Sequence, residues 1–130
     1  MSKKILSIDD SKMVHMVIAR TLKPYDIEVI TALNGQEGLD KAHQEHPDLI
    51  VLNMTMPVMD GYEALLKLKE SPQTKGIPVV MLSADGGAAS MEKALQAGAV
   101  KFISKPFNSD SLLSALPEFL ALELRAVEAV

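Results

Sequence analysis

Short apolar runs alternate along the chain with longer stretches in which apolar residues recur at helical spacing. The runs are rich in isoleucine, leucine and valine, which is typical of strands buried on both faces of a parallel sheet. They lie at residues 4–8, 27–30, 49–52, 78–82 and 100–103. The apolar spacing after each run predicts a helix behind every strand. The pattern therefore predicts an α/β fold, in which helices cover both faces of a five-stranded parallel sheet.

The order of the strands in this sheet is restricted by the handedness of the connections. Right-handed crossovers leave few arrangements, and the flavodoxin-like order 2-1-3-4-5 is the common one for five strands. No internal repeat, low-complexity segment or linker interrupts the 130 residues. We therefore expect one doubly wound domain over residues 1–130.

The last helix is expected at about residues 109–128. Pro117 lies within it, where a proline removes a backbone hydrogen bond and clashes with the preceding turn. We expect a kink or a break near this residue. The apolar residues beyond Pro117 have two interpretations, an interaction segment or a helix end that folds back on its own sheet.

The composition restricts the compartment and the partners. The chain contains no cysteine, which excludes disulfides and thiolate metal sites and favours a reducing cytoplasm. No apolar stretch is long enough for a signal sequence or a membrane span. The net charge is −4 and the lysines are scattered among acids, whereas nucleic-acid binding depends on clustered basic residues. We expect a cytoplasmic domain that binds neither membranes nor nucleic acid.

Polar side chains follow four of the predicted strands at their carboxyl ends, where open parallel sheets bind ligands. Asp9 and Asp10 follow the first strand, Asn53 the third, Ser83 the fourth and Lys105 the fifth. These strands are neighbours in the expected order, so the side chains should converge on one mouth. Two carboxylates, an amide carbonyl oxygen and a backbone carbonyl oxygen suit Mg²⁺, and a hydroxyl and a lysine could hold an anion beyond it. The residues predict phosphate chemistry at a carboxylate, although an amide, Asn53, stands at the centre.

Four stretches in this order resemble the motifs of bacterial response regulator receiver domains, those of the chemotaxis type included. They are Ile8–Ser11, Leu52–Gly61, Met81–Ala84 and Ser104–Phe107, and the similarity covers about residues 3–116. Known chemotaxis receivers have the strand order 2-1-3-4-5, so that expectation is not independent of the resemblance. The resemblance implies a regulatory domain rather than an enzyme, because receivers catalyse only their own phosphoryl transfer and dephosphorylation.

The resemblance also implies which residues would hold the metal. Asp9 and Asp10 would be the acidic pair, with Asp10 closest to Mg²⁺. The backbone carbonyl of Thr55 would be a further ligand. Asn53 occupies the position of the phosphoryl-accepting aspartate, which in the family is also a metal ligand.

Further roles follow from the same resemblance. Ser83 would contact the phosphoryl group, and Lys105 would pair with it. Phe102 would be the aromatic residue that changes rotamer with Ser83 on activation. The Lys105–Pro106 peptide bond is a candidate for the cis form.

Asn53 decides what this chain can do chemically. A carboxylate is a competent nucleophile towards phosphorus, whereas an amide oxygen carries no charge, so no acyl phosphate is expected. The missing charge should also weaken Mg²⁺ binding, since a charge pair roughly 4 Å apart contributes about 4 kcal/mol at an effective dielectric constant of 20. We favour an engineered aspartate-to-asparagine block, because Asp9, Asp10, Ser83 and Lys105 are all retained. The alternative is a natural receiver that works without phosphorylation.

The expected function is that of a stand-alone receiver in a two-component phosphorelay, acting by phosphorylation-controlled contact with other proteins. The partners implied are a sensor histidine kinase or a phosphotransfer protein, and a downstream target. The target would bind the face formed by the helix around Met91, the strand at residues 100–103 and the last helix.

Two enzyme-like or ligand-binding alternatives fit less well. A Mg²⁺-dependent phosphohydrolase of similar fold usually has an Asp-x-Asp pattern after the first strand, where this chain has Asp9-Asp10-Ser11. A nucleotide or flavin binder needs a loop rich in Gly, Ser or Thr there, and an acidic loop would repel phosphate. His15, His43 and His46 are expected to be surface residues without a role, because none has metal-ligand spacing.

Overall fold

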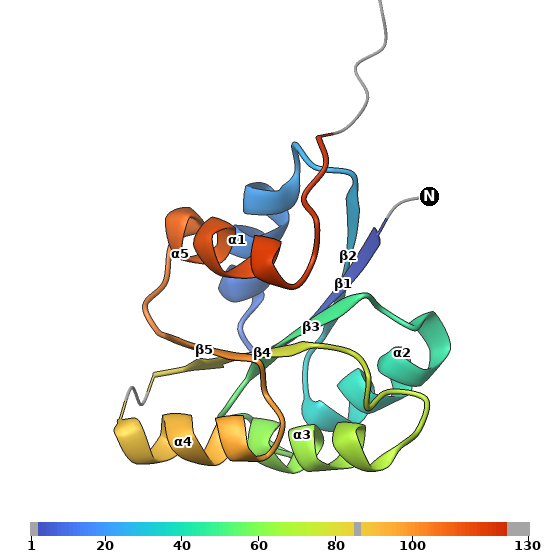
Figure 1. The fold of residues 1–130 in the computed structure, drawn as a ribbon, viewed down its shortest axis with the longest axis vertical. Coiled ribbons are helices and arrows are strands. Elements are labelled where there is room, and N and C mark those ends of the chain that lie inside the picture. The colour runs from blue at the N-terminus through green and yellow to red at the C-terminus, as the bar shows by residue number, and fades with distance from the viewer. Residues whose placement is uncertain (1–2, 85–86, 125–130) are drawn as a thin grey trace, which may run out of the picture.

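The computed structural model describes residues 3–84 and 87–124, which form a parallel sheet between two layers of helices (Figure 1). The sheet has five strands in the order β2-β1-β3-β4-β5, which confirms the expected fold class and strand order. The strands are β1 (Lys3–Ile8), β2 (Ile27–Ala32), β3 (Leu49–Asn53), β4 (Val79–Ser83) and β5 (Lys101–Ser104). All neighbouring pairs are parallel, so the carboxyl ends of the strands meet at one edge.

The helices are α1 (Lys12–Leu22), α2 (Gly35–Glu45), α3 (Gly61–Glu70), α4 (Ala88–Gln96), α5 (Ser109–Ala115) and the 3₁₀ turn η1 (Leu116–Glu118). Four of them begin after a short polar residue whose side chain accepts a free backbone N–H group. Ser11, Asn34, Asp60 and Asn108 cap α1, α2, α3 and α5 in this way. Figure 1 shows α1 and α5 on one face of the sheet and α2, α3 and α4 on the other. None of the helices in the described part of the chain has both the length and the apolar character that a membrane crossing needs.

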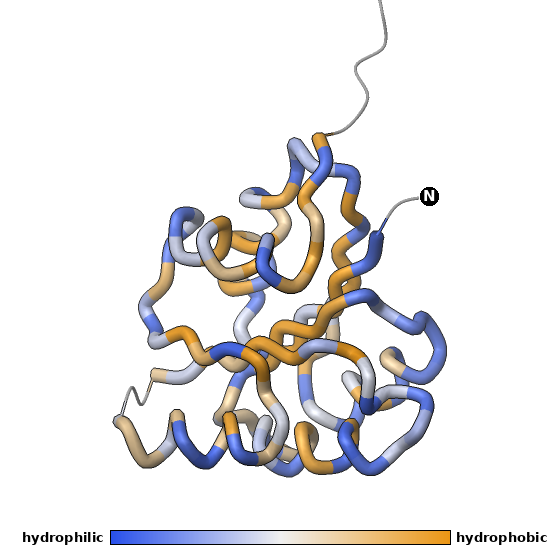
Figure 2. The backbone as a smooth tube through the Cα atoms, viewed as in Figure 1, coloured by the Kyte–Doolittle hydropathy of each residue, from blue (hydrophilic) through white to orange (hydrophobic). Residues whose placement is uncertain are grey.

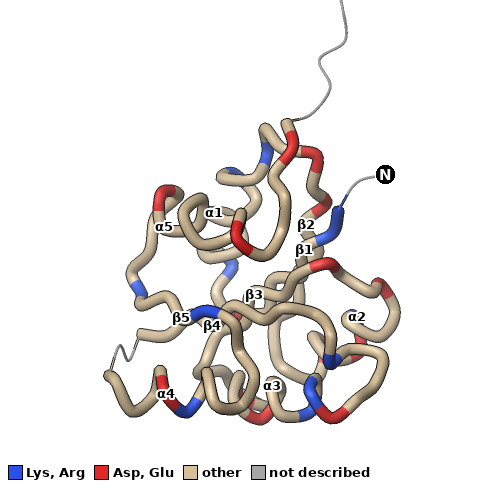
Figure 3. Tube along the Cα trace, viewed as in Figure 1, with Lys and Arg blue, Asp and Glu red and all other residues tan. Residues whose placement is uncertain are grey.

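Two apolar layers hold the helices against the sheet, because alternate residues of each strand face opposite sides. Ile5 of β1 packs in the layer under α1 and α5, whereas Leu6 and Ile8 pack in the layer under α2, α3 and α4. Every residue of β3 is buried, as expected for a central strand. Apolar residues line the sheet in Figure 2, and charges of both signs are interspersed along the described trace in Figure 3.

The end of the described chain differs from the expected long helix. Helix α5 ends at Ala115, and Pro117 lies in η1, so the expected break near this proline is confirmed. The expected helix beyond it is wrong for residues 119–124, which are not helical; residues 125–128 lie outside the described residues. The physical reason is that Pro117 cannot donate the next helical hydrogen bond, and its ring clashes with the preceding turn.

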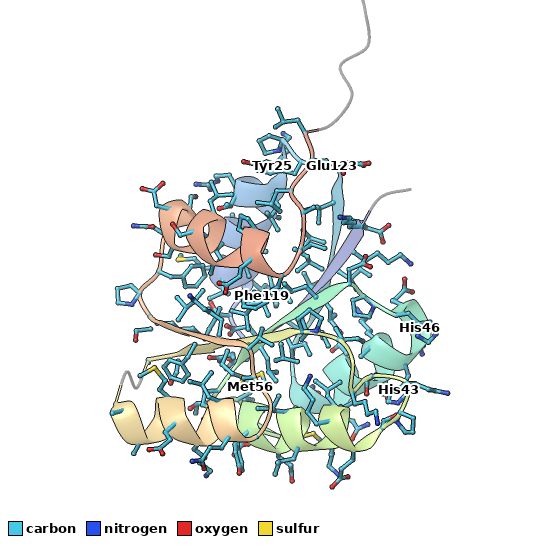
Figure 4. The ribbon with its side chains drawn as sticks, in the orientation of Figure 1. Tyr25, His43, His46, Met56, Phe119 and Glu123 are labelled. Atoms are coloured by element: carbon cyan, nitrogen blue, oxygen red, sulfur yellow. The ribbon has the colours of Figure 1, made fainter. Side chains whose placement is uncertain are left out.

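Residues 119–124 instead fold back on the domain. The backbone N–H of Asp26 donates to the carbonyl oxygen of Glu123 at 2.7 Å, and Tyr25 forms an antiparallel bridge with Leu124. Figure 4 shows Tyr25 and Glu123 side by side at this end of the molecule. Leu120 is buried in the apolar layer under α1 and α5. Of the two interpretations of this segment, folding back is the one observed, although the segment is not a helix.

Candidate functional site

The sheet register gathers the predicted site residues at one edge. Asn53 pairs with Leu82, and Ser83 pairs with Ser104, so the carboxyl ends of β3, β4 and β5 lie level. Lys105 follows β5 directly, and its backbone N–H donates to the carbonyl oxygen of Ser83 at 2.7 Å. The expected convergence of these side chains on one mouth is therefore observed.

Asp9 is the buried centre of the charge network, with a side chain that is 1% exposed. The Nζ atom of Lys105 lies 3.1 Å from Asp9 Oδ2. The other carboxylate oxygen, Oδ1, accepts from the backbone N–H of Ser11 at 2.9 Å and from Asn53 Nδ2 at 3.3 Å. A buried carboxylate needs this combination of cation and N–H donors, because an unpaired charge is costly away from water.

Asn53 points its amide nitrogen at the acid pair. Its Nδ2 atom donates to the Thr55 carbonyl oxygen at 2.7 Å, to Asp9 Oδ1 at 3.3 Å and to Asp10 Oδ1 at 3.4 Å. An amide nitrogen has only two protons, so these acceptors share them. The expected ligand atom was the amide oxygen, and the structure places the nitrogen there instead. The reason is that an oxygen at this point would face other oxygen acceptors, whereas an N–H group can donate to them.

The same oxygen atoms fit the chemistry of a magnesium site. Carboxylate and backbone carbonyl oxygens of Asp9, Asp10 and Thr55 surround one point, and Mg²⁺ prefers oxygen ligands and keeps several waters. Within residues 3–84 and 87–124, no group of three or more His, Cys, Asp or Glu residues is placed to hold a metal ion. The residue at this point is Asn53, so the described site contains two acids. The donor set therefore fits Mg²⁺ with one charge fewer than a three-acid site has.

The residues expected to contact the phosphoryl group, or to respond to it, belong to β4, β5 and the segment after β5. Ser83 is the last residue of β4 and is 2% exposed. The Lys105–Pro106 peptide bond is cis, as expected. Phe102 of β5 is partly buried and packs against the apolar layer under α2, α3 and α4. Its role as a switch stays a prediction.

An apolar groove opens beside Lys105, between the start of α1 and the segment after β5. Its volume is about 420 Å³, and Met13, Val14, Val17 and Phe107 form much of its lining. Met13 is 73% exposed. No motif in the sequence predicted this groove. The available signal was an apolar position, Met13, on the outer side of an amphipathic helix.

The histidines are placed differently from what the sequence suggested. His15 is buried and contacts Ser7 and the backbone of Asp9, so its expected surface position is wrong. His43 is partly buried and bridges Leu39 and Ser71, whereas His46 is an exposed helix cap. Figure 4 shows His43 and His46 on α2, at the side of the molecule away from α5. The spacing of His15 with Ile18 and Leu22 was the signal that it faces inward.

The doubly wound sheet, with an acid pair and a lysine gathered at its carboxyl edge, is the architecture of a two-component signalling regulator. The chain belongs to the response regulator receiver domain family, whose sequence model matches residues 5–117. It is 39% identical over 115 residues to chemotaxis protein CheY of Listeria monocytogenes serovar 1/2a, a match that covers 87% of this chain and 94% of that protein.

Solved structures agree with this assignment. Chemotaxis protein CheY4 of Vibrio cholerae is 32% identical and superposes with a TM-score of 0.86, covering 92% of this chain and 100% of that one. The receiver domain of sensor histidine kinase PA1611 from Pseudomonas aeruginosa PAO1 is 25% identical, with a TM-score of 0.82 over 92% of this chain and 98% of that one. That structure contains a magnesium ion coordinated in the active site cleft.

Proposed function

We propose that this chain is a receiver of a two-component phosphorelay that is held in the unphosphorylated state by Asn53. The observation that carries the proposal is the position of the Asn53 amide at the end of β3, 3.3 Å from the carboxylate of Asp9. This is the place where the family has its phosphoryl-accepting aspartate. An engineered aspartate-to-asparagine replacement accounts for an amide inside a site whose other residues are retained.

The chemistry of the site explains why an amide blocks it. An aspartate at position 53 would attack phosphorus with a carboxylate oxygen, while the bond from phosphorus to the donor breaks and the donor leaves. Lys105 would pair with a phosphoryl oxygen, and the Ser83 hydroxyl would donate to another. Mg²⁺, when bound, would supply positive charge against the phosphoryl oxygens, as the metal in the PA1611 receiver suggests. Asn53 lacks the charged oxygen that the first of these steps requires.

The Asn53 amide also supports a preference for the inactive conformer. Its N–H groups neutralise part of the repulsion between Asp9 and Asp10, which a phosphorylated receiver would have to relieve with a metal. A receiver switches by a shift between two populated conformers. A chain that cannot accept the phosphoryl group keeps the unphosphorylated conformer dominant.

The partners follow from the family. A sensor histidine kinase or a phosphotransfer protein would be the donor, and a downstream protein would bind the face formed by α4, β5 and α5. Three large apolar side chains support a contact surface there: Met91 and Leu95 of α4, which are 38% and 43% exposed, and Val100 before β5, which is 37% exposed. Exposed apolar residues that lie close together are typical of protein interaction sites.

The test is intact mass after incubation with Mg²⁺ and a small acyl phosphate, for this protein and for Asn53→Asp side by side. We expect a phosphate-sized gain in mass only for Asn53→Asp. No gain in either protein would favour a natural receiver that works without phosphorylation. A gain in the Asn53 protein itself would show that the acceptor is another residue.

A further inference from the structure

His15 of α1 contacts the segment that carries the acid pair, Asp9 and Asp10. Its side chain projects from α1 towards β1 and is 8% exposed. Its Nε2 atom lies 2.8 Å from the backbone carbonyl oxygen of Asp9, and its Nδ1 atom lies 2.8 Å from the Oγ atom of Ser7. Ser7 is completely buried on the same face of β1 as Asp9. The ring therefore spans two residues of the strand that carries the acids.

The chemistry of the acceptor determines the proton on Nε2. A carbonyl oxygen can only accept, so Nε2 must carry a proton and donate it to Asp9. In the neutral ring, Nδ1 then accepts from the hydroxyl of Ser7. This arrangement satisfies every polar group of the bridge, which neither an aliphatic residue nor a lysine could do in the same space.

This bridge lies where β1 ends and its pairing with β3 stops. The last register pair between β1 and β3 is Ile8 with Leu52. The backbone N–H of Asp9 still donates to the carbonyl oxygen of Ala32 at 3.0 Å. The carbonyl oxygen of Asp9, in contrast, accepts from Nε2 of His15 in α1. Since the peptide group is planar, the position of this oxygen sets the orientation of the peptide that leads to Asp10.

We propose that His15 is a positioning residue for the metal and phosphoryl site. By holding the Asp9 carbonyl, it sets the direction in which the carboxylates of Asp9 and Asp10 face the point now taken by Asn53 Nδ2. The inference deepens the proposed function and rests on it. His15 itself does not touch the metal point or the acceptor; it acts through the backbone between the two acids.

The test uses the full chain with Asn53→Asp as the parent. His15→Gln keeps an N–H donor within reach of the Asp9 carbonyl but loses the pairing with Ser7. His15→Asn keeps an acceptor for Ser7 but is too short to reach Asp9, and His15→Leu removes both contacts. Magnesium dissociation constants come from isothermal titration calorimetry, melting temperatures from scans in chelator, and phosphorylation rates from intact mass with an acyl phosphate.

The chain offers a matched control. His43 also bonds a backbone carbonyl, that of Leu39 at 2.9 Å, and a serine hydroxyl, that of Ser71 at 3.2 Å. It does so between α2 and the end of α3, away from the acids. His43→Leu should therefore reproduce the loss of stability of His15→Leu without its effect on the metal.

We expect His15→Leu and His15→Asn to weaken Mg²⁺ binding roughly tenfold and to slow phosphorylation, which is the usual size of such an indirect effect. His15→Gln and Ser7→Ala keep an N–H donor for the Asp9 carbonyl, and His43 lies away from the acids, so all three variants should stay within about twofold of the parent. The proposal is overturned if His15→Gln is no better than His15→Asn, or if Mg²⁺ affinity follows the melting temperature across all variants. If His15→Leu does not fold, the comparison of His15→Gln with His15→Asn decides. If the parent takes no phosphoryl group, the proposed function fails, but the Mg²⁺ affinities still test His15.

Discussion

The side-chain amide of Asn53 donates to the buried carboxylate of Asp9, with 3.3 Å between Nδ2 and Oδ1. The same nitrogen also reaches Asp10 and the carbonyl of Thr55. An N–H donor thus lies among oxygen atoms that would otherwise repel one another. This relationship connects the stability of the domain directly to the residue that we propose blocks its phosphorylation.

Asn53→Asp should therefore destabilise the protein in chelator. The substitution removes hydrogen bonds to charged acceptors and adds a like charge, which together should lower the free energy of unfolding by about 2–4 kcal/mol. For a domain of this size the melting temperature should fall by about 8–15 °C. Mg²⁺ should restore most of the loss, because it binds the folded state and not the unfolded one. Thermal scans with chelator and with Mg²⁺ measure both effects.

The control for this change is Asn108→Asp, which adds the same charge at the start of α5. The Asn108 side chain is exposed and accepts from the N–H of Ser111, which an aspartate does equally well. Its melting temperature should be close to that of the starting protein and insensitive to Mg²⁺. Equal behaviour of Asn53→Asp and Asn108→Asp would contradict the contact of the Asn53 amide with Asp9 and Asp10.

Lys105→Met should destabilise the protein more than a surface lysine substitution does. Lys105 Nζ lies 3.1 Å from Asp9, whose side chain is 1% exposed, so the change leaves a buried carboxylate without this cation. We expect a loss of about 1–3 kcal/mol in urea unfolding, because the N–H donors of Ser11 and Asn53 remain. Lys101→Met is the control, since Lys101 forms a 3.9 Å pair with Glu118 in which both side chains are exposed. Lys101→Met should change the free energy of unfolding by less than about 0.5 kcal/mol. Equal losses in the two variants would show that the Lys105–Asp9 pair stabilises the protein no more than an exposed ion pair does.

Val58→Asn should stabilise the protein. Val58 has a φ of 71° in the loop after β3, and a β-branched residue is strained in this left-handed region. Its side chain is 84% exposed, so little packing is lost on substitution. Asparagine tolerates the conformation, and we expect a gain of about 1 kcal/mol in denaturant unfolding. Val100→Asn is the control, because Val100 is also exposed but does not have a positive φ. It should bring no gain in stability. A gain at Val100, or no gain at Val58, would argue against backbone strain at Val58.

Leu120→Ala and Leu124→Ala test the fold-back of the chain after η1. Leu120 is 6% exposed in the apolar layer under α1 and α5, and its truncation should cost about 2–4 kcal/mol. Leu124 is 71% exposed, and its truncation should change stability by less than about 0.5 kcal/mol. Chemical unfolding of both variants gives the comparison. Small effects at both positions would mean that the segment does not pack on the domain in solution.

The alternation of strands and helices could be predicted from the sequence because burial on both faces of a parallel strand demands a continuous apolar run. The central strand Leu49–Asn53 is the plainest case, since every residue in it is buried. Once the connections are right-handed, few strand orders remain. The convergence of Asp9, Asn53 and Lys105 then follows from their positions at strand ends. Local pattern and chain handedness reduced the possible strand orders to a few, and the resemblance to receiver domains supported the order 2-1-3-4-5 among them.

Other features depended on which surfaces meet in the folded domain. The sequence showed a proline in the last helix, but only the tertiary structure showed that the chain then returns to Asp26 and buries Leu120. A histidine at an inward helical position could equally have been a simple core residue. Its pairing with Ser7 and the Asp9 carbonyl exists because α1 packs at one particular place along β1.

The amide of Asn53 depends on both the sequence and the tertiary structure. Its chemical identity, and with it the absence of a nucleophilic carboxylate, was determined by the sequence alone. The direction in which the amide points was decided by the tertiary structure, because Asp9 and Asp10 lie more than 40 residues before Asn53 and reach its amide only when β1 pairs with β3. Hydrogen-bond partners that lie far apart in the chain leave no periodic signal, and only packing brings their atoms together.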